Sequence, residues 1–334
     1  MQQEADAGEP GFAVAHLTAA ARAELGTGRR LVATERLRGG SKKGVYRLAF
    51  DDGATVIGYA WHPSQDYWRH AAPQPPGDPA DPFAPATGSG LFASCHALLS
   101  QLGVRTPQVY LLDRSRSASP ADIALVEDVR GGTLESQLDR AAAVPHPALA
   151  ELRGALRRMH QHRRARIGKA GLPGLAVGRS SEQAVTDRAY TDLAEAAGRV
   201  PRIAAAREPL AAALRELAAA VPRRAEHALI HGELGPDHVL LDDRAQPVLI
   251  DIEGLMFFDV EWEHVFLELR FGAGYRWLAA GGLDPARLRL YRLALSLSLV
   301  AGPLRLLDGD FPDRAGMLSI VEYNTGRVLA ALDC

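Results

Sequence analysis

Polar side chains flank two short apolar segments in the C-terminal third of the chain. The segments Val239–Leu241 and Val248–Ile250 are predicted strands, and Asp242 and Asp243 supply the turn between them. Four polar residues precede the first strand and one ends the second: His231, Glu233, Asp237, His238 and Asp251. Because a hairpin brings its two ends together, we expect Glu233, His238 and Asp251 to converge on one site.

These residue types suit the handling of a phosphorylated nucleotide. Carboxylate oxygens and an imidazole nitrogen can hold a divalent metal that carries the nucleotide phosphates. A further carboxylate can orient a hydroxyl group and receive its proton. The alternative is a polar loop beside a strand that ends in acidic residues, and either segment alone would fit that interpretation. The joint spacing of the two segments favours a functional site.

The stretch also resembles the catalytic core of the aminoglycoside phosphotransferase family, which has the protein-kinase-like fold. The family pattern is H-G-D-x-x-x-x-N followed by I-D-x-x-G. The chain has His231-Gly232-Glu233, with His238 in the asparagine place, and then Ile250-Asp251-Ile252-Glu253-Gly254. By resemblance, Glu233 takes the place of the catalytic carboxylate that receives or orients the acceptor hydroxyl proton, and His231 belongs to the same catalytic loop. Asp251 takes the place of the aspartate that holds Mg2+ against the nucleotide phosphates.

The resemblance places a histidine where a second metal ligand is usual. His238 there is similar to the variant of macrolide phosphotransferases, which favour GTP, so the phosphoryl donor is expected to be ATP or GTP. Glu233 is one methylene longer than the family aspartate. Asp237 is a nearby substitute carboxylate, although its offset in the motif makes it the less suitable base. Downstream, Asp259 and Glu263 resemble the D-x-x-x-D element of the family, a structural brace behind the site.

Lysine is rare in this chain: among the 38 Lys plus Arg residues, the only lysines are Lys42, Lys43 and Lys169. The family usually has a lysine on the third strand that contacts the nucleotide phosphates, and a glutamate on the following helix that holds it. Here the strand place is taken by Gly58 or Tyr59, and the helix around residues 94–99 offers no glutamate. Both members of the pair are missing together.

A glycine-rich turn near the N-terminus offers a replacement for this charge. The segment RGGSKKG contains Gly39, Gly40, Ser41, Lys42, Lys43 and Gly44. Glycines let the backbone approach phosphates closely, and a cation in the same turn would face them. An exposed basic hairpin turn is the alternative. We expect the turn to bind the nucleotide, with Lys42 or Lys43 replacing the missing strand lysine.

The flanking sequence predicts the elements that position these residues. Short strands with tight connections are expected at 31–37, 45–50 and 54–61, forming an antiparallel meander, with a second pair at 109–112 and 123–126. Helical spacing is found at 91–102, 149–159, 203–220 and 285–307, the last with Asp284 as N-cap. The Pro-rich stretch 62–90 is expected to be a loop or insertion, and the basic string 157–169 a solvated helix end.

These elements predict an α+β protein with a strand-rich N-terminal part and a helix-rich C-terminal part, and the family resemblance implies the bilobal protein-kinase-like fold. Residues 1–127 would form an N-lobe with an antiparallel sheet, the glycine-rich turn and the insertion, and residues 128–334 a mainly helical C-lobe with the acceptor pocket. By resemblance, Glu127 and Val129 lie in the hinge whose backbone binds the purine edge. The aromatic residues beside the insertion are expected to pack in the core, or to form a substrate-facing lid: Trp61, Tyr67 and Trp68.

Composition excludes several partners. The 38 basic and 40 acidic residues give a formal charge of -2, whereas a duplex-binding protein usually carries a basic surplus. Cys95 and Cys334 cannot form a disulfide framework, and the N-terminal segment lacks the pattern of a secretory signal. The uncharged apolar run Leu293–Leu304 is too short to span a bilayer. We expect a cytoplasmic monomer or homodimer that binds neither nucleic acid nor membrane.

The motifs together imply transfer of a γ-phosphoryl group. The expected reaction moves this group from Mg2+-bound ATP or GTP to a hydroxyl of a small molecule, and an antibiotic whose modification confers resistance is the favoured acceptor. Aminoglycoside, macrolide and nucleoside types stay open. The alternatives are a metabolic small-molecule kinase and a catalytically inactive nucleotide-binding protein. A protein kinase is disfavoured because no activation-segment-like stretch follows IDIEG.

Overall fold

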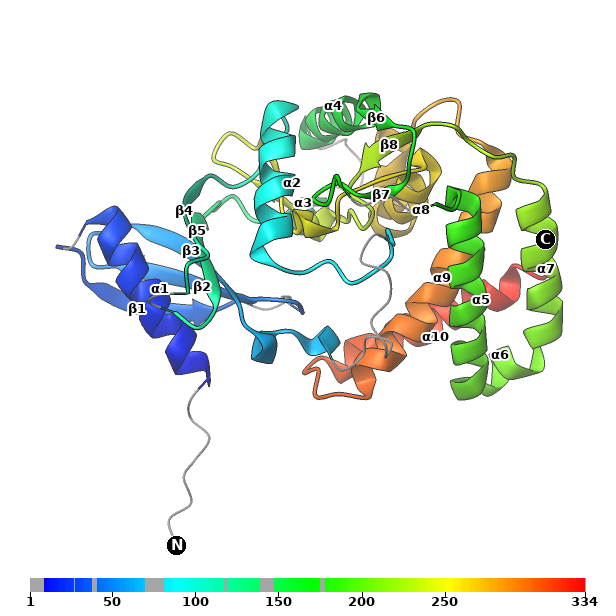
Figure 1. Ribbon diagram of the computed structural model, residues 1–334, viewed down its shortest axis with the longest axis horizontal. Helices are drawn as coiled ribbons and strands as arrows, with labels where there is room; N and C mark the ends of the chain where they lie inside the picture. The colour runs from blue at the N-terminus through cyan, green and yellow to red at the C-terminus, as the bar shows by residue number, and fades with distance from the viewer. Residues whose placement is uncertain are drawn as a thin grey trace, which may run out of the picture.

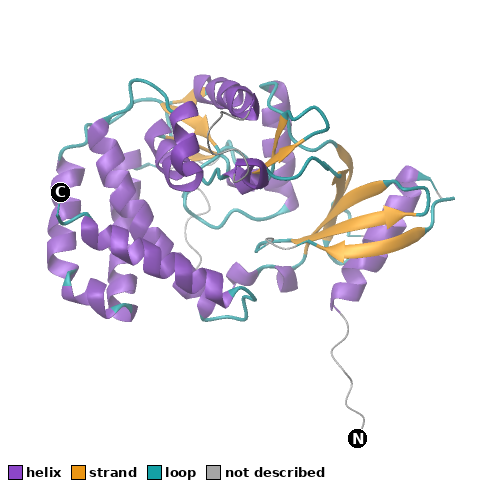
Figure 2. Ribbon diagram, turned by 180° about the vertical axis from the view of Figure 1, so that it is seen from behind, coloured by secondary structure: helices purple, strands orange, loops and turns teal. Residues whose placement is uncertain are grey.

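The computed structural model describes residues 9–26, 28–37, 41–69, 81–116, 119–138, 147–174 and 178–333. An antiparallel sheet with one helix against it lies at one end of the molecule, and most of the helices lie at the other (Figures 1 and 2). The predicted α+β, bilobal architecture is therefore confirmed.

The N-terminal region is a five-stranded antiparallel sheet in the order β1 (Leu31–Arg36), β2 (Gly44–Phe50), β3 (Thr55–Trp61), β5 (Asp122–Glu127) and β4 (Val109–Asp113). The predicted meander and the second pair of strands are both confirmed. Every second residue of β2 is buried, and Tyr46, Leu48 and Phe50 share a core cluster with Leu17 of α1 (Glu9–Leu25). Burial of this apolar face is what holds α1 against the sheet.

Neighbouring residues of β3 face opposite sides of the sheet, as the pleat requires. Gly58 lies beneath α1, where an added Cβ would come within 2.8 Å of Leu17. Tyr59 and Trp61 lie on the other side, and their rings contact Phe92 of α2 (Ser89–Gln101). Tyr59 is therefore the residue of β3 that faces the rest of the chain.

The hairpin predicted around residue 245 is confirmed. Strands β9 (Val239–Leu241) and β10 (Pro247–Leu249) are antiparallel, with Val239 opposite Leu249. A separate four-stranded sheet lies beside them in the order β6 (Arg163–Arg164), β8 (His227–Ile230), β11 (Met256–Phe258) and β7 (Gly168–Lys169). The 3-10 turns η3 (Pro236–His238) and η4 (Ile252–Gly254) begin and end the segment that carries the motif.

The helical region is built around one long helix. Its helices are α3 (Leu134–Leu138), α4 (Pro147–Gln161), α5 (Ser181–Arg199), α6 (Pro201–Ala205), α7 (Arg207–Ala219), α8 (Val260–Phe271), the 3-10 helix η5 (Gly272–Trp277), α9 (Pro285–Leu307) and α10 (Arg314–Ala330). Asp284 caps α9 as predicted, because its side chain accepts from the amides of Ala286 and Arg287. Helix α9 alone among the described helices is long and apolar enough to cross a membrane, and two thirds of that apolar window is buried among α5, α8 and α10.

Two sequence predictions differ from the structure in detail. The single helix expected at 203–220 is two helices, α6 and α7. The basic string 157–169 is not one helix end: α4 ends at Gln161, and β6 and β7 pair with β8 and β11. Within 62–90, the structure has the 3-10 turns η1 (Pro63–Gln65) and η2 (Tyr67–Arg69) and the start of α2, while residues 70–80 lie outside the described residues.

Candidate active site

The loop after β8 carries the first motif and is held from behind by one buried carboxylate. Gly232 has a φ of +89°, a conformation that favours glycine. The Oε2 atom of Glu263 accepts from the amide of His231 at 2.5 Å. Burial raises the pKa of Glu263 to about 7, although the amides of His231, Gly232 and Leu234 act in the opposite direction. This geometry makes Glu263 a support for the loop.

Asp259, the other residue of the expected brace, joins α8 to the elements around it. It is fully buried and accepts from His227 at 3.1 Å and from the hydroxyls of Ser181 at 2.8 Å and Tyr291 at 2.5 Å. It also pairs with Arg287. Burial opposes ionisation, but the His227 hydrogen bond and the Arg287 charge bring the pKa of Asp259 down to about 2. The start of α8 is thereby fixed to β8, α5 and α9.

The structure brings the two motifs together through His231 and His238. The Nε2–H group of buried His231 donates to the carbonyl of Ile250 at 3.0 Å, and the amide of Ile250 donates to the carbonyl of His238. The two imidazole rings stack, and their centres lie 5.8 Å apart. The loop after β8 is thus tied directly to the residue before Asp251.

The remaining motif side chains differ in availability. Glu233 is exposed. Its carbonyl accepts from the Nδ1–H group of His238 at 3.0 Å. In the neutral ring the hydrogen is then on Nδ1, and Nε2 carries a lone pair. Asp237 is engaged, because its Oδ1 accepts from Arg270 at 2.7 Å. Because Arg270 occupies its carboxylate, Asp237 is less free than exposed Glu233 to contact an acceptor hydroxyl.

Lys43 reaches the second motif across more than two hundred residues of sequence. Its Nζ atom lies 3.1 Å from Oδ1 of Asp251 and 2.6 Å from Oε1 of Glu253. Burial lowers the pKa of Lys43, but the charges of these two carboxylates hold it well above its ordinary value. The Lys43 ammonium in turn holds the pKa of Asp251 well below its usual range. Of the two lysines of the turn, Lys43 is the one whose ammonium meets Asp251.

The turn that carries Lys43 is fixed by aromatic residues. Ser41 accepts from the indole Nε1–H of Trp68 at 3.1 Å through its hydroxyl, and from the amide of Tyr67 at 2.9 Å through its carbonyl. Gly44 is required by close packing, because an added Cβ would lie 2.7 Å from the ring of Tyr46. Gly39 and Gly40 lie outside the described residues.

Lys169 is a buried cation that the sequence analysis assigned to a solvated helix end. It lies on β7, is only 4% exposed, and its Nζ donates to the carbonyl of Pro82 at 3.0 Å. Burial and the charge of Lys42 lower the pKa of Lys169 to about 8, while Glu233 acts in the opposite direction. The assignment was wrong because residues 163–169 pair as strands. The scarcity of lysine was the available signal.

The residues expected in the hinge lie at the end of β5. The amide of Glu127 donates to the carbonyl of Gln108, and its carboxylate accepts from Arg105 at 2.7 Å and from the amide of Gln108 at 3.0 Å. Val129 is buried. The Glu127 side chain therefore fixes the end of β5 to the segment before β4.

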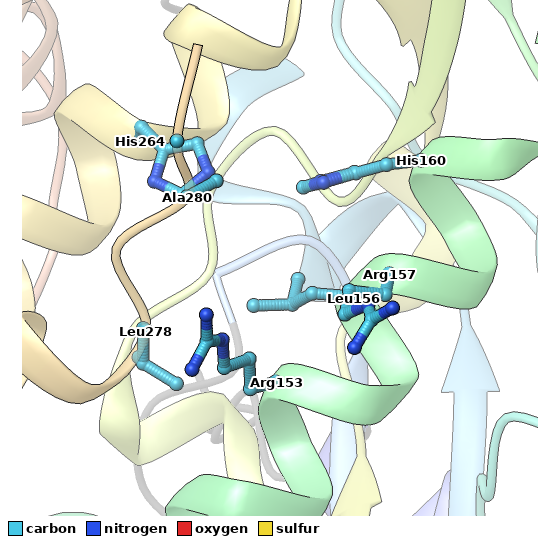
Figure 3. Close-up of a pocket in the computed structure, with 8 residues that line it drawn as sticks. Arg153, Leu156, Arg157, His160, His264, Leu278 and Ala280 are labelled. Atoms are coloured by element: carbon cyan, nitrogen blue, oxygen red, sulfur yellow. The ribbon is translucent and has the colours of Figure 1, made fainter. Parts of the chain in front are cut away.

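A cavity of about 180 Å3 lies between α4, α8 and the segment after η5 (Figure 3). Arg153, Leu156, Arg157 and His160 of α4 line it, together with His264 of α8, Leu278 and the residues that follow. Burial lowers the pKa of His160 to about 3 and that of His264 to about 4, so both rings are neutral at pH 7. None of the residues predicted to be functional lines this cavity.

Comparisons with known proteins agree with this geometry. Residues 81–291 match the family described as APH, phosphotransferase enzyme family. No curated protein matches the sequence. Similar solved structures include the complex of the aminoglycoside phosphotransferase APH(2")-IIIa with GDP and kanamycin, with 16% identity, 93% of this chain and 99% of that chain covered, and a TM-score of 0.62.

Two further structures have the same fold at a similar level. The spectinomycin phosphotransferase APH(9)-Ia with ADP and spectinomycin has 13% identity, 91% and 94% coverage, and a TM-score of 0.61. The choline kinase LicA of Streptococcus pneumoniae has 14% identity, 95% and 99% coverage, and a TM-score of 0.59. At such identities the structures establish the fold, and the family match covers more than half of the sequence. The chain is therefore a member of the phosphotransferase enzyme family, with the kinase-like fold.

Proposed function

We propose that the protein transfers the γ-phosphoryl group of Mg2+-bound ATP or GTP to a hydroxyl of a small-molecule antibiotic and so confers resistance. The observation that carries this proposal is the contact of Lys43 with Asp251, next to the loop that presents Glu233. A cation, a metal-binding carboxylate and a carboxylate for the acceptor are the parts that phosphoryl transfer needs, because its catalysis is mostly positioning and charge stabilisation.

Asp251 and His238 fit a magnesium nucleotide. The carboxylate of Asp251 is 48% exposed and already attracts one cation, and the Nε2 lone pair of His238 is available. The described residues contain no cluster of three or more His, Cys, Asp or Glu side chains that could hold a metal ion. Phosphate oxygens and water would complete the coordination, as is usual for Mg2+. The bound ion would neutralise charge on the β- and γ-phosphates.

The other residues of the site have separate roles in the proposed reaction. Lys43 binds the donor phosphates, and the turn at Ser41 and Lys42 covers them. Glu233 orients the acceptor hydroxyl and receives its proton as the oxygen–phosphorus bond forms and the bond from the γ-phosphorus to the bridging oxygen breaks. The nucleoside diphosphate leaves with that electron pair. His231 keeps the two motifs in register through Ile250.

The acceptor class follows from both the relatives and the local charge. Kanamycin and spectinomycin are the ligands of two similar structures, which supports an antibiotic. The charge of Lys169 interacts with the charges of both Lys42 and Glu233. The surroundings of Glu233 therefore include positive charge. An acceptor with few positive charges, such as a macrolide or a nucleoside antibiotic, suits these surroundings better than a polycationic aminoglycoside.

A metabolic small-molecule kinase is the second candidate. The similarity to the choline kinase and to a fructosamine-3-kinase homologue of Haemophilus somnus, at TM-scores of 0.59 and 0.56, favours it. The site geometry is the same under both proposals, so the acceptor separates them.

An acceptor panel tests the proposal. Purified protein with Mg2+ and ATP or GTP is incubated with macrolides, nucleoside antibiotics, aminoglycosides, choline and fructosamines, and products are identified by mass spectrometry. A phosphorylated antibiotic supports the proposal. Phosphorylation of only choline or a fructosamine replaces it with the metabolic kinase, and nucleotide binding with no product from any class supports an inactive protein instead.

A further inference from the structure

In the family the lysine comes from the third strand and the glutamate from the following helix, which here are β3 and α2. Tyr59 and Trp61 of β3 face α2, whereas Gly58 faces Leu17 on the opposite side. The ammonium of Lys43 lies 5.3 Å from the centre of the Tyr59 ring. Helix α2 contains no acidic residue, and Cys95 is fully buried on it. A lysine–glutamate pair cannot form from these two elements.

Glu253 supplies the missing carboxylate from a different element. It belongs to η4, which packs against α2. Glu253 therefore comes from an element beside the helix that carries the glutamate in the family.

Glu253 is dedicated to Lys43. Its side chain is 6% exposed, and Oε1 lies 2.6 Å from Nζ of Lys43. Oε2 is buried with no hydrogen-bond partner among the described residues. Because removing one partner of a buried ion pair leaves an uncompensated charge, each of the two side chains depends on the other. Asp251, by contrast, is half exposed and has a second role available.

We propose that Lys43 and Glu253 form a relocated phosphate-binding pair, in which Glu253 positions the Lys43 ammonium against the nucleotide phosphates. When Mg2+ and nucleotide engage Asp251, Glu253 keeps Lys43 in place. The pair joins the turn before β2 to the loop after β10, so it also fastens the N-terminal sheet to the catalytic region. This inference rests on the proposed nucleotide-dependent function.

A double-mutant cycle on nucleotide affinity tests the pair without any acceptor. Binding of a fluorescent ADP analogue with Mg2+ is measured for wild type, Lys43→Met, Glu253→Gln and the double variant. Glu151→Gln, an exposed substitution on α4, is the matched control. We expect each single variant to weaken nucleotide binding at least about tenfold. The double variant should have the same affinity as the weaker-binding single variant, because the effects of coupled residues do not add. The control should bind as wild type does.

The outcomes separate this inference from the proposed function. Wild type that binds no nucleotide would contradict the function itself. Wild type that binds, with Glu253→Gln of equal affinity or with single losses that multiply in the double variant, would overturn the pair alone. Melting temperature and circular dichroism identify a variant that fails to fold.

A second variant covers failure of Glu253→Gln to fold. Combining Tyr59→Lys with Lys43→Met returns an ammonium to β3, at the side chain whose ring centre lies 5.3 Å from the present Lys43 ammonium. We expect this double variant to regain affinity over Lys43→Met. A folded double variant with no gain would overturn the relocation.

Discussion

Glu263 gives a prediction whose magnitude follows from the structure. The change is Glu263→Gln, which removes ionisation and keeps the shape of the side chain. The Oε2 atom accepts the amide of His231, while Oε1 is buried without a partner among the described residues. A glutamine can therefore keep its carbonyl on the loop and place its NH2 group at the Oε1 position. The substitution tests the charge of Glu263 rather than its packing.

The expected pH dependence follows from the raised pKa of Glu263. This pKa is about 7 in the folded protein, whereas the ordinary pKa of a glutamate is 4.5. As the pH rises, the Glu263 carboxyl ionises in the unfolded chain before it ionises in the folded protein. The stability that the protonated carboxyl contributes is therefore fully present below pH 4.5 and is lost as the pH rises to 7 and beyond. Because one pKa unit corresponds to about 1.4 kcal/mol, the carboxyl costs the wild type on the order of 2–3 kcal/mol between about pH 5 and pH 8. The glutamine variant does not lose this free energy.

Urea unfolding of both proteins at several pH values measures this difference. The stability of Glu263→Gln relative to wild type should rise by about 2–3 kcal/mol from about pH 5 to pH 8, with most of the change complete near pH 7. Other groups, including His160 and His264, titrate in both proteins, so the comparison uses the difference between them. A difference that stays constant over this range would refute the view that burial raises the pKa of Glu263 to about 7.

Three further substitutions have defined outcomes. Glu233→Gln should lower kcat by about 100-fold or more, because general-base contributions are of this size, while nucleotide affinity measured by fluorescence stays the same. Lys169→Met should raise the free energy of unfolding at pH 7 by roughly 2 kcal/mol, because a buried ammonium with a pKa of about 8 destabilises the folded protein below that pH. Loss of the hydrogen bond to Pro82 offsets part of this gain. Urea unfolding should show a larger gain at pH 7 than at pH 10. Gly232→Ala should lower both stability and kcat, because the added Cβ would lie 2.9 Å from Met256 and the backbone has a φ of +89°. A variant that matches wild type in thermal melting and in turnover would contradict the assigned loop geometry.

The sequence predicted those parts of the site that depend on local pattern. The strands of the meander and the hairpin have alternating or apolar segments bounded by turn residues, and His231, Glu233 and Asp251 lie at fixed spacings around the hairpin. The rarity of lysine singled out both Lys42 and Lys43, and the contact with Asp251 distinguishes Lys43. Each of these signals lies within a short window of sequence.

The parts that escaped prediction depend on contacts between distant segments. Glu253 meets Lys43 across 210 positions, and nothing near Glu253 indicates which cation it binds. Lys169 follows a basic string that favours a solvated helix end, yet pairing of β7 with β11 buries it. Tertiary pairing overrides local pattern in both places.

Transfer of labelled γ-phosphate tests the central claim most directly. Wild-type protein and Asp251→Ala are compared with labelled ATP and GTP, Mg2+ and whichever acceptor the panel identifies, after both proteins are shown to be folded. We predict transfer by wild type and loss of transfer in Asp251→Ala, because the carboxylate that faces Lys43 and the metal is removed. Wild-type turnover that survives in Asp251→Ala would contradict the assignment of this site.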